Sequence, residues 1–376
     1  MDDLTARTWA EIDLGNIEHN YRVLRSRLKG NCKFLGVVKA DGYGHGAVQV
    51  ARRLKGAGCE YLATATVFEA VSLRQSGLDL PILVLGFTPA ENASLLLQND
   101  ITQSISDVET ASKMASLAKS ENKKLKVHIK LDSGMGRLGF RCCDGPFDMN
   151  SVLSILKMDG LDPEGVFTHF AVSEISDPTY TKGQFSDFTR TVSEIESAWG
   201  HKFKIKHCAN SAATMMYEEM QLDMVRPGIA LYGCAPGDSL CGLDLRQAME
   251  LKTRIYSIKT MPKGASVSYG RNFIAPSDRK IAVIPVGYAD GLHRVLSNRI
   301  EVLVAGKRVK QVGNICMDMC MIDVTDIENV SKGDVVTLFG RDGENFIPIE
   351  EMAHKAGTIA HEIMCGISKR IPRVYK

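Results

Sequence analysis

The chain has 376 residues, of which 44% are hydrophobic and 24% charged, a composition typical of a globular protein with a large core. Its 46 basic and 44 acidic side chains leave a formal net charge of +2, which gives no reason to expect nucleic acid or an anionic membrane as a partner. No apolar run approaches the ~18 residues of a membrane span. The acidic start at Met1–Thr5 is unlike a signal peptide, so we expect a cytoplasmic protein.

Ten cysteines are present, and their spacing favours neither disulfides nor a metal. Cys142 and Cys143 are adjacent, and no paired CxxC spacing occurs. Others, such as Cys316 and Cys320, lie in apolar runs. The pattern predicts buried, reduced thiols and no metal site.

In chain order, residues 8–13 resemble a strand, and eight short apolar runs then alternate with amphipathic stretches. The expected strands are 34–38, 61–66, 82–85, 101–105, 125–131, 165–170, 204–208 and 224–226, and expected helices include 47–57, 67–75, 90–98 and 108–118. This alternation predicts an α/β domain with a parallel sheet. A closed eight-stranded (β/α)8 barrel over residues 1–245 fits the length. A doubly wound sheet is the alternative, but no GxGxxG follows its first strand.

From about residue 245 onward, strand-sized apolar runs are separated by turn signals. This pattern predicts a second, mainly β domain over residues 246–376. The expected strands are 254–260, 280–286, 300–304, 309–312, 320–323 and 335–339, with a short helix at 349–356. Residues 1–13 are compatible with either domain and can pair with the β domain.

The first candidate for chemistry is Lys39, which follows an apolar strand and precedes a glycine-rich turn containing Tyr43. Lysine forms Schiff bases and shifts its pKa readily when buried. Glycines let the backbone approach a ligand closely. Together they suggest covalently held pyridoxal phosphate with Tyr43 as a phosphate ligand, although a surface lysine is the simpler interpretation of this segment alone.

Polar side chains recur where other predicted barrel strands end, and functional residues of barrels gather at that end. The further candidates are Lys130, Arg137, His169, His207, Asn210, Ser211 and Arg226. Any one of them could be an ordinary loop residue. Their repeated placement at one barrel face favours a site.

These segments and several others make the chain similar to the alanine racemases, a family of fold-type III pyridoxal-phosphate enzymes. The matching segments are VVKADGYGHG (37–46), HIKLDSGMGRLGF (128–140), FTHFA (167–171), HCANSAA (207–213), VRPGIALYG (225–233), VSYGRNF (267–273), IPVGYADG (284–291), GNICMDMCMI (313–322) and ISKRIPRVY (367–375). Nine segments in family order cover essentially the whole chain. The resemblance implies a barrel followed by a β domain.

It also implies racemisation of L- and D-alanine by two bases, which supplies D-alanine for peptidoglycan. Lys39 would hold the cofactor and act on one face of the substrate Cα, and Tyr269 would act on the other. In the family the tyrosine comes from the second subunit, so the resemblance implies a homodimer with shared sites.

The remaining roles also follow from the resemblance. Tyr43, Ser211, Gly228 and Ile229 would hold the cofactor phosphate, and Arg226 would face the pyridine nitrogen and keep it unprotonated. Further cofactor contacts would come from Leu85, His169 and Asn210, and substrate contacts from Arg137, Met317, Asp318, Tyr288 and His361. Lys130 matches a lysine that is carbamylated in many members, with an unmodified lysine as the alternative.

His361 departs from the family, which usually has a tyrosine there. Imidazole is smaller than phenol and can donate or accept a hydrogen bond, and related serine racemases carry a polar residue at this position. A serine or dual alanine/serine racemase is therefore the alternative to an alanine racemase, and a neutral replacement is the simpler explanation.

Three other classes fit less well. A non-catalytic pyridoxal-phosphate carrier should lack the β domain, a fold-type III decarboxylase should carry a C-terminal Cys-Asp motif, and an interaction module would not need so many titratable groups at one barrel face. Some serine racemases carry a membrane domain ahead of the racemase, so the chain could be part of a longer protein.

Overall fold

The computed structural model describes residues 4–237 and 242–376, which form two compact units. The barrel unit contains Ile17–Gly42 and Ala47–Leu245. The β unit contains the described residues up to Asn16, together with Tyr43–Gly46 and Arg246–Lys376. The chain therefore passes from one unit to the other within the glycine-rich turn that follows Lys39.

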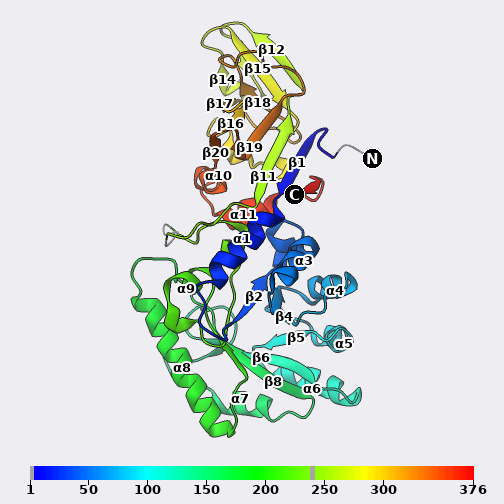
Figure 1. The fold of residues 1–376 in the computed structure, drawn as a ribbon, viewed down its shortest axis with the longest axis vertical. Coiled ribbons are helices and arrows are strands. Elements are labelled where there is room, and N and C mark those ends of the chain that lie inside the picture. The colour runs from blue at the N-terminus through cyan, green and yellow to red at the C-terminus, as the bar shows by residue number, and fades with distance from the viewer. Residues whose placement is uncertain (1–3, 238–241) are drawn as a thin grey trace. The chain divides into compact units, whose positions relative to one another are not determined.

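Eight parallel strands form the sheet of the barrel unit (Figure 1). They are β2 (Lys33–Val37), β3 (Tyr61–Thr64), β4 (Ile82–Val84), β5 (Thr102–Ile105), β6 (Leu125–Asp132), β8 (Leu161–Phe167), β9 (Ile205–His207) and β10 (Met224–Val225), with the short β7 (Phe140–Arg141) beside β6. From β2 to β9 each strand pairs with the next strand of this series, and β10 pairs with β2. All eight predicted strands are confirmed.

The sheet is a nearly closed barrel because β9 and β10 also approach each other. The Asp223 amide donates to the Lys206 carbonyl at 3.1 Å, and the Arg226 amide donates to the Ala209 carbonyl at 2.9 Å. Strands in sequential order with the last beside the first define a barrel, whereas a doubly wound sheet reverses its order. The doubly wound alternative is therefore wrong.

Helices connect the barrel strands and bury one apolar side. They are α1 (Leu14–Arg25), α3 (Ala47–Ala57), α4 (Val67–Gln75), α5 (Ala93–Gln98), α6 (Val108–Ser120), α7 (Met149–Leu156), α8 (Thr179–Trp199) and α9 (Ser211–Met216). Val50, Ala51 and Leu54 of α3 are buried, the spacing of a helix face. The expected helix 90–98 begins as a 3₁₀ turn at Ala90–Asn92 before α5.

The β unit is built on one long, mostly antiparallel sheet and a small hairpin. Its strands are β1 (Thr8–Ile12), β11 (Met249–Arg254), β12 (Ser257–Met261), β13 (Ser266–Val267), β14 (Phe273–Ile274), β15 (Arg279–Ile284), β16 (Glu301–Val304), β17 (Lys307–Val312), β18 (Cys320–Asp323), β19 (Val335–Asp342), β20 (Asn345–Ile347) and β21 (Arg373–Tyr375). Two helices, α10 (Ile349–Ala356) and α11 (Ala360–Gly366), follow β20. Strand β1 lies between β11 and β21.

The single strand predicted over residues 254–260 is wrong, because the chain makes two strands there. β11 ends at Arg254 and pairs with β1 and β19, while β12 starts at Ser257 and pairs with β15. Between them, the Ile255 amide donates to Asp334 and the Tyr256 amide to Val283. An apolar run alone does not show where a strand changes partners.

The nine cysteines among the described residues are free thiols, and most of them are buried. Cys241 lies outside the described residues. Burial raises the pKa of the Cys208 and Cys59 thiols to about 12, so both stay protonated. In the described part of the chain, no helix is both long enough and apolar enough to cross a bilayer.

Candidate active site

The turn after Lys39 has left-handed backbone at several successive residues. This turn, α2 (Lys39–Tyr43), places Ala40 at φ 52°, Asp41 at φ 55° and Gly42 at φ 61°, each with ψ between 45° and 48°. The left-handed conformation costs about 1–2 kcal/mol for each residue that carries a Cβ. Such strain persists only where surrounding contacts fix it, and it is concentrated at functional sites. The turn therefore marks Lys39, which lies two residues after the end of β2, as a candidate site residue.

Contacts within the β unit hold the second half of this turn, around Tyr43. Arg373 Nε donates to the Gly44 carbonyl at 3.0 Å, and a Cβ on Gly44 would meet the Met364 carbonyl oxygen at 2.4 Å. The Tyr43 ring is buried, and its centroid lies 5.7 Å from that of His361. Because burial raises the pKa of Tyr43, its hydroxyl stays protonated and can donate a hydrogen bond.

Lys130, on β6, ends in a buried amine that makes no hydrogen bond among the described residues. Its Nζ lies 4.7 Å from the centroid of the Phe167 ring. Burial, followed by the charge of Arg226, lowers the pKa of Lys130 to about 7. A buried amine without a partner is costly, so this lysine is prepared either for a ligand or for chemical modification.

Arg226 follows β10 and is the centre of a buried network of hydrogen bonds. Its Nη1 lies 2.9 Å from His207 Nδ1, and its Nη2 donates to the Thr168 and Cys208 carbonyls at 2.8 and 3.1 Å. Burial lowers the pKa of Arg226 only to about 10, so it stays charged. In the described part of the chain it pairs with no carboxylate, which leaves its charge available to a ligand.

His207 and His128 extend this hydrogen-bond network, and the partners of their ring nitrogens determine which nitrogen carries the proton. Burial, then Arg226, holds the pKa of His207 well below its usual value and that of His128 at about 3. Neutral His207 accepts from Arg226 at Nδ1, so its Nε2–H donates to His128 Nδ1 at 2.8 Å. The stacked Phe167 ring fixes His207 from its side, with centroids 4.8 Å apart.

Four basic side chains act on His169, which directly follows Thr168 after the end of β8. Burial holds the pKa of His169 well below its usual value, and Arg226, Lys130, Arg137 and Lys39 lower it further. Arg226 Nη2 lies 3.4 Å from His169 Nδ1. So much positive charge at one end of the barrel favours an anionic ligand.

Arg137 belongs to an exposed loop that a single carboxylate shapes. Asp132, the last residue of β6, accepts hydrogen bonds from the amides of Gly134, Met135 and Gly136 at 2.8–3.1 Å. The loop carries Arg137, whose charge lowers the pKa of His169. Arg137 is therefore one of four predicted basic residues whose charges lower the pKa of His169.

Ser211 and Asn210 fix the segment between β9 and α9. Ser211 Oγ accepts from the amides of Gly228 at 2.9 Å and Ala230 at 3.3 Å. Asn210 caps α9 by accepting from Ala213 at 3.0 Å, and it also accepts from Ser173 Oγ at 2.9 Å. Ser211, Gly228 and Ile229 are buried and adjacent, so the structure brings these predicted phosphate contacts together.

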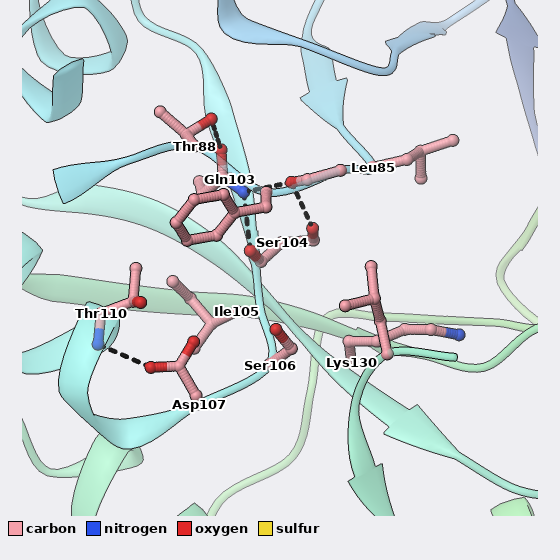
Figure 2. A pocket seen from close by; sticks show the side chains of 12 residues that line it. Leu85, Thr88, Gln103, Ser104, Ile105, Ser106, Asp107, Thr110 and Lys130 are labelled. Atoms are coloured by element: carbon pink, nitrogen blue, oxygen red, sulfur yellow. Dashed lines mark hydrogen bonds between the residues drawn. The ribbon is translucent and has the colours of Figure 1, made fainter. Parts of the chain in front are cut away.

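Leu85 lines a small pocket at the ends of β4, β5 and β6, and Lys130 lines the same pocket (Figure 2). The loop after Leu85 is held by Gln103, which accepts from Thr88 Oγ1 at 2.7 Å and donates to the Gly86 carbonyl at 2.8 Å. Gln103 is buried in β5. The position of Leu85 therefore depends on a glutamine that the sequence did not single out.

In the β unit, Tyr269 stands on a strained and well-supported turn. Ser268, Gly270 and Arg271 have φ of 71°, 70° and 52°. Asn314 Nδ2 donates to the Tyr269 carbonyl at 2.7 Å, and Ser268 Oγ donates to the Asn314 carbonyl at 2.6 Å. The Tyr269 side chain is 74% exposed, so the turn presents the phenol outward.

The other predicted residues of the β unit lie near one another in sequence or structure. The Tyr288 amide donates to Cys316 at 3.0 Å, next to Met317, and Asp318 pairs with Arg370 at 2.8 Å. Arg370 also binds the buried Asp290 at 2.7 Å. A surface hollow beside this segment is lined by Tyr269, Ser268, Val267, Cys316, Met319, Met321, Met261, Ile281, Val283, Ser266 and Lys259.

The sequence pattern placed His207 at a strand end but assigned it no role. It did not identify His128, Phe167 or Gln103 as residues of the candidate site. His128 and Gln103 lie inside strands β6 and β5. A polar residue at an inward position of a barrel strand is the available signal, because each inward position must fill the barrel core.

Both parts of the chain match the sequence profiles of one family. Residues 12–236 match "Alanine racemase, N-terminal domain" and residues 248–375 match "Alanine racemase, C-terminal domain". The chain is 44% identical over its full length to alanine racemase 2 of Caldanaerobacter subterraneus subsp. tengcongensis, covering 96% of that protein. It is 43% identical to the alanine racemase of Methanococcus maripaludis, with 98% of each chain covered.

Solved structures of alanine racemases are also similar to this chain. The alanine racemase of Clostridium difficile 630 superposes with a TM-score of 0.93 at 40% identity, over 99% of this chain and 96% of that one. The alanine racemase of Bartonella henselae, solved with covalently bound pyridoxal phosphate, superposes with a TM-score of 0.88 at 28% identity, over 99% and 100%.

Proposed function

We propose that this chain, which belongs to the alanine racemase family, interconverts L- and D-alanine with pyridoxal phosphate as its cofactor. The observation that carries the proposal is the buried, charged Arg226, whose Nη2 lies 3.4 Å from His169 Nδ1, together with Lys39 at the start of the left-handed turn after the first barrel strand. We further propose that the enzyme works in the cytoplasm and supplies D-alanine for peptidoglycan.

The residues present fit this cofactor, which is an anion with an aldehyde. Within the barrel unit, Lys39 would provide an amine, Ser211 a hydroxyl, and the backbone at Gly228 and Ile229 the remaining phosphate contacts. Leu85 and Asn210 would line the same site. When bound, pyridoxal phosphate would supply an electron sink that acidifies the Cα–H bond of the amino acid.

Racemisation needs a proton to leave one face of Cα and another to arrive on the opposite face. We assign Lys39 to one face and Tyr269 to the other, as general bases and acids in turn. Arg226, charged and without a carboxylate among the described residues, would face the pyridine nitrogen and keep it unprotonated. His169 would organise Arg226, and Arg137 would bind the substrate carboxylate.

Exposure of Tyr269 and its surroundings supports a homodimer with shared sites. Tyr269, Met317 and Met319 are all exposed beside the apolar hollow, and an exposed apolar patch of this kind marks an interaction site. We propose that a second copy covers this surface and that Met317, Asp318 and Tyr288 then approach the substrate of the partner.

The direct test is racemisation of L-alanine and L-serine, measured side by side by chiral chromatography on protein purified with pyridoxal phosphate. Conversion of L-alanine to D-alanine, together with a visible absorbance band of retained cofactor, supports the proposal. Absence of both would refute it.

Lys130 is expected to be carbamylated. Only a neutral amine reacts with CO₂, and a pKa of about 7 leaves the Lys130 amine largely neutral at pH 8 and largely protonated below pH 7. Protein in isotopically labelled bicarbonate should therefore show a carbamate carbon signal by NMR that is strongest above pH 7 and declines below it. The signal should disappear in Lys130→Met, and its persistence there would assign it to another amine.

A serine or dual alanine/serine racemase is the second candidate, because His361 contacts the Tyr43 ring that would bind the phosphate. A buried serine hydroxyl without a partner costs roughly 1–3 kcal/mol, and His361 could provide that partner directly or through water.

His361→Tyr is expected to raise the ratio of kcat/KM for alanine over serine about tenfold, the equivalent of one hydrogen bond of about 1.4 kcal/mol. Steady-state kinetics on both amino acids measures this ratio. His354→Tyr, on α10, serves as a control that should leave the ratio unchanged. If His361→Tyr also leaves it unchanged, the serine candidate is wrong.

A further inference from the structure

Glu69 in α4 contacts the first peptide of the left-handed turn. Its Oε1 accepts from the Ala40 amide at 2.6 Å, while its Oε2 accepts from the amides of Ala65 and Thr66 at 2.8 and 3.2 Å. One carboxylate thus joins the residue after Lys39 to the segment between β3 and α4. We refer to these three hydrogen bonds as the Glu69 clamp.

The Glu69 carboxylate accepts more hydrogen bonds than a helix cap requires. A capping box needs Thr66 Oγ1 to accept from the Glu69 amide, here at 3.3 Å, and Glu69 to accept from the Thr66 amide. The bonds to Ala65 and Ala40 are additional, and the Ala40 bond is the shortest. Ala40 is 29 residues away in sequence, so this contact serves the turn and not the helix.

The turn needs such support because its backbone is strained on the side of Lys39. Ala40 and Asp41 carry Cβ atoms at positive φ, and neither is buried. Inside the turn the Gly42 amide donates to Val38 at 2.8 Å, and Asp41 Oδ1 accepts from the Ala47 amide at 2.9 Å. These bonds fix the far end of the turn, and the Glu69 clamp fixes the end next to Lys39.

We propose that Glu69 is a positioning residue, which aims the Lys39 amine by holding the left-handed turn. The proposal rests on the function proposed above and adds a residue to it. A displacement of a reacting group by about 1 Å can cost about 10²-fold in rate, so loss of the clamp should act on catalysis and not only on stability.

The test compares Glu69→Gln with Thr66→Ala in the full-length holoenzyme. Glutamine retains one carbonyl oxygen, so it cannot accept from both Ala40 and the Ala65–Thr66 pair. Thr66→Ala removes the helix cap but keeps the carboxylate bond to Ala40. We expect Glu69→Gln to lower kcat for alanine by up to about 10²-fold with KM little changed, and to speed amide hydrogen exchange over residues 38–43. Thr66→Ala should lower only the melting temperature.

A rescue experiment separates positioning from a general loss of structure. Adding Ala40→Gly to Glu69→Gln should restore much of kcat, because glycine adopts the left-handed conformation without the Cβ penalty. Failure of this rescue in a folded double variant would overturn the proposal. So would Glu69→Gln kinetics and exchange that match those of Thr66→Ala.

If Glu69→Gln does not fold, hydrogen exchange of the wild-type protein still decides the matter. The Ala40 amide should be protected although Ala40 is exposed, and exchange at the unprotected rate would refute the clamp. A wild type that neither racemises alanine nor retains the cofactor refutes the proposed function itself, whereas an active wild type without the clamp signature refutes only the role of Glu69.

Discussion

Lys39→Ala is expected to remove both the visible absorbance band of the bound cofactor and racemase activity. The amine follows β2 at the cationic end of the barrel, and alanine leaves neither the covalent link nor the base on one face of Cα. General acid–base groups typically contribute about 10²–10⁴-fold, and the loss should be at least of this order. Absorbance spectra of purified protein and chiral product analysis measure the two effects.

Lys33→Ala is the matched control, since Lys33 begins the same strand but is exposed. It should keep the band and the activity. A Lys39→Ala protein that still binds the cofactor covalently, through Lys130 or any other lysine, would contradict the assignment.

Tyr269→Phe is expected to abolish proton abstraction from one enantiomer, by resemblance L-alanine, while the cofactor stays bound. Phenylalanine preserves the ring on the strained turn and removes only the hydroxyl. We expect a loss of at least about 10²–10⁴-fold, measured as exchange of the Cα hydrogen with deuterated solvent for each enantiomer. Tyr256→Phe, another exposed tyrosine of the β unit at 62% exposure, should show no loss.

Mixing the two inactive chains extends this result to the dimer. If sites are shared, a mixed dimer of Lys39→Ala and Tyr269→Phe contains one site with both bases, so activity should recover as the subunits exchange. Exchange without any recovery would show that each chain builds its own site.

The sequence predicted the barrel well because its signal is local and repeated. Each of the eight apolar runs ends near a turn, and the helices between them carry one apolar side. The β unit was harder to predict: β13, β14 and β20 have two or three residues, too few for a periodic pattern. The break between β11 and β12 depends on which distant strand each one pairs with, and a short window does not contain that information.

Some features of the candidate site can be predicted from the sequence, and others cannot. Lys39, Lys130 and Arg226 are predictable because each lies within two residues of a strand end. The neutral state of His207 and the isolated amine of Lys130 are not predictable, since both arise from burial against Phe167 and Arg226 in the folded barrel. The left-handed conformation at Ala40 and Asp41 is equally hidden, because neither residue type demands it.

The position of β1 between β11 and β21 also affects how the protein is made. Ala10 pairs with Leu251 and Arg373, so its first partner leaves the ribosome about 240 residues after it. At roughly 5–20 residues per second, the strand stays without its partner for about 12–48 s. During that time β1 is a free edge able to pair with other nascent chains. We therefore expect the yield of native protein in cells to depend on translation speed and on chaperones that bind the first residues of the chain.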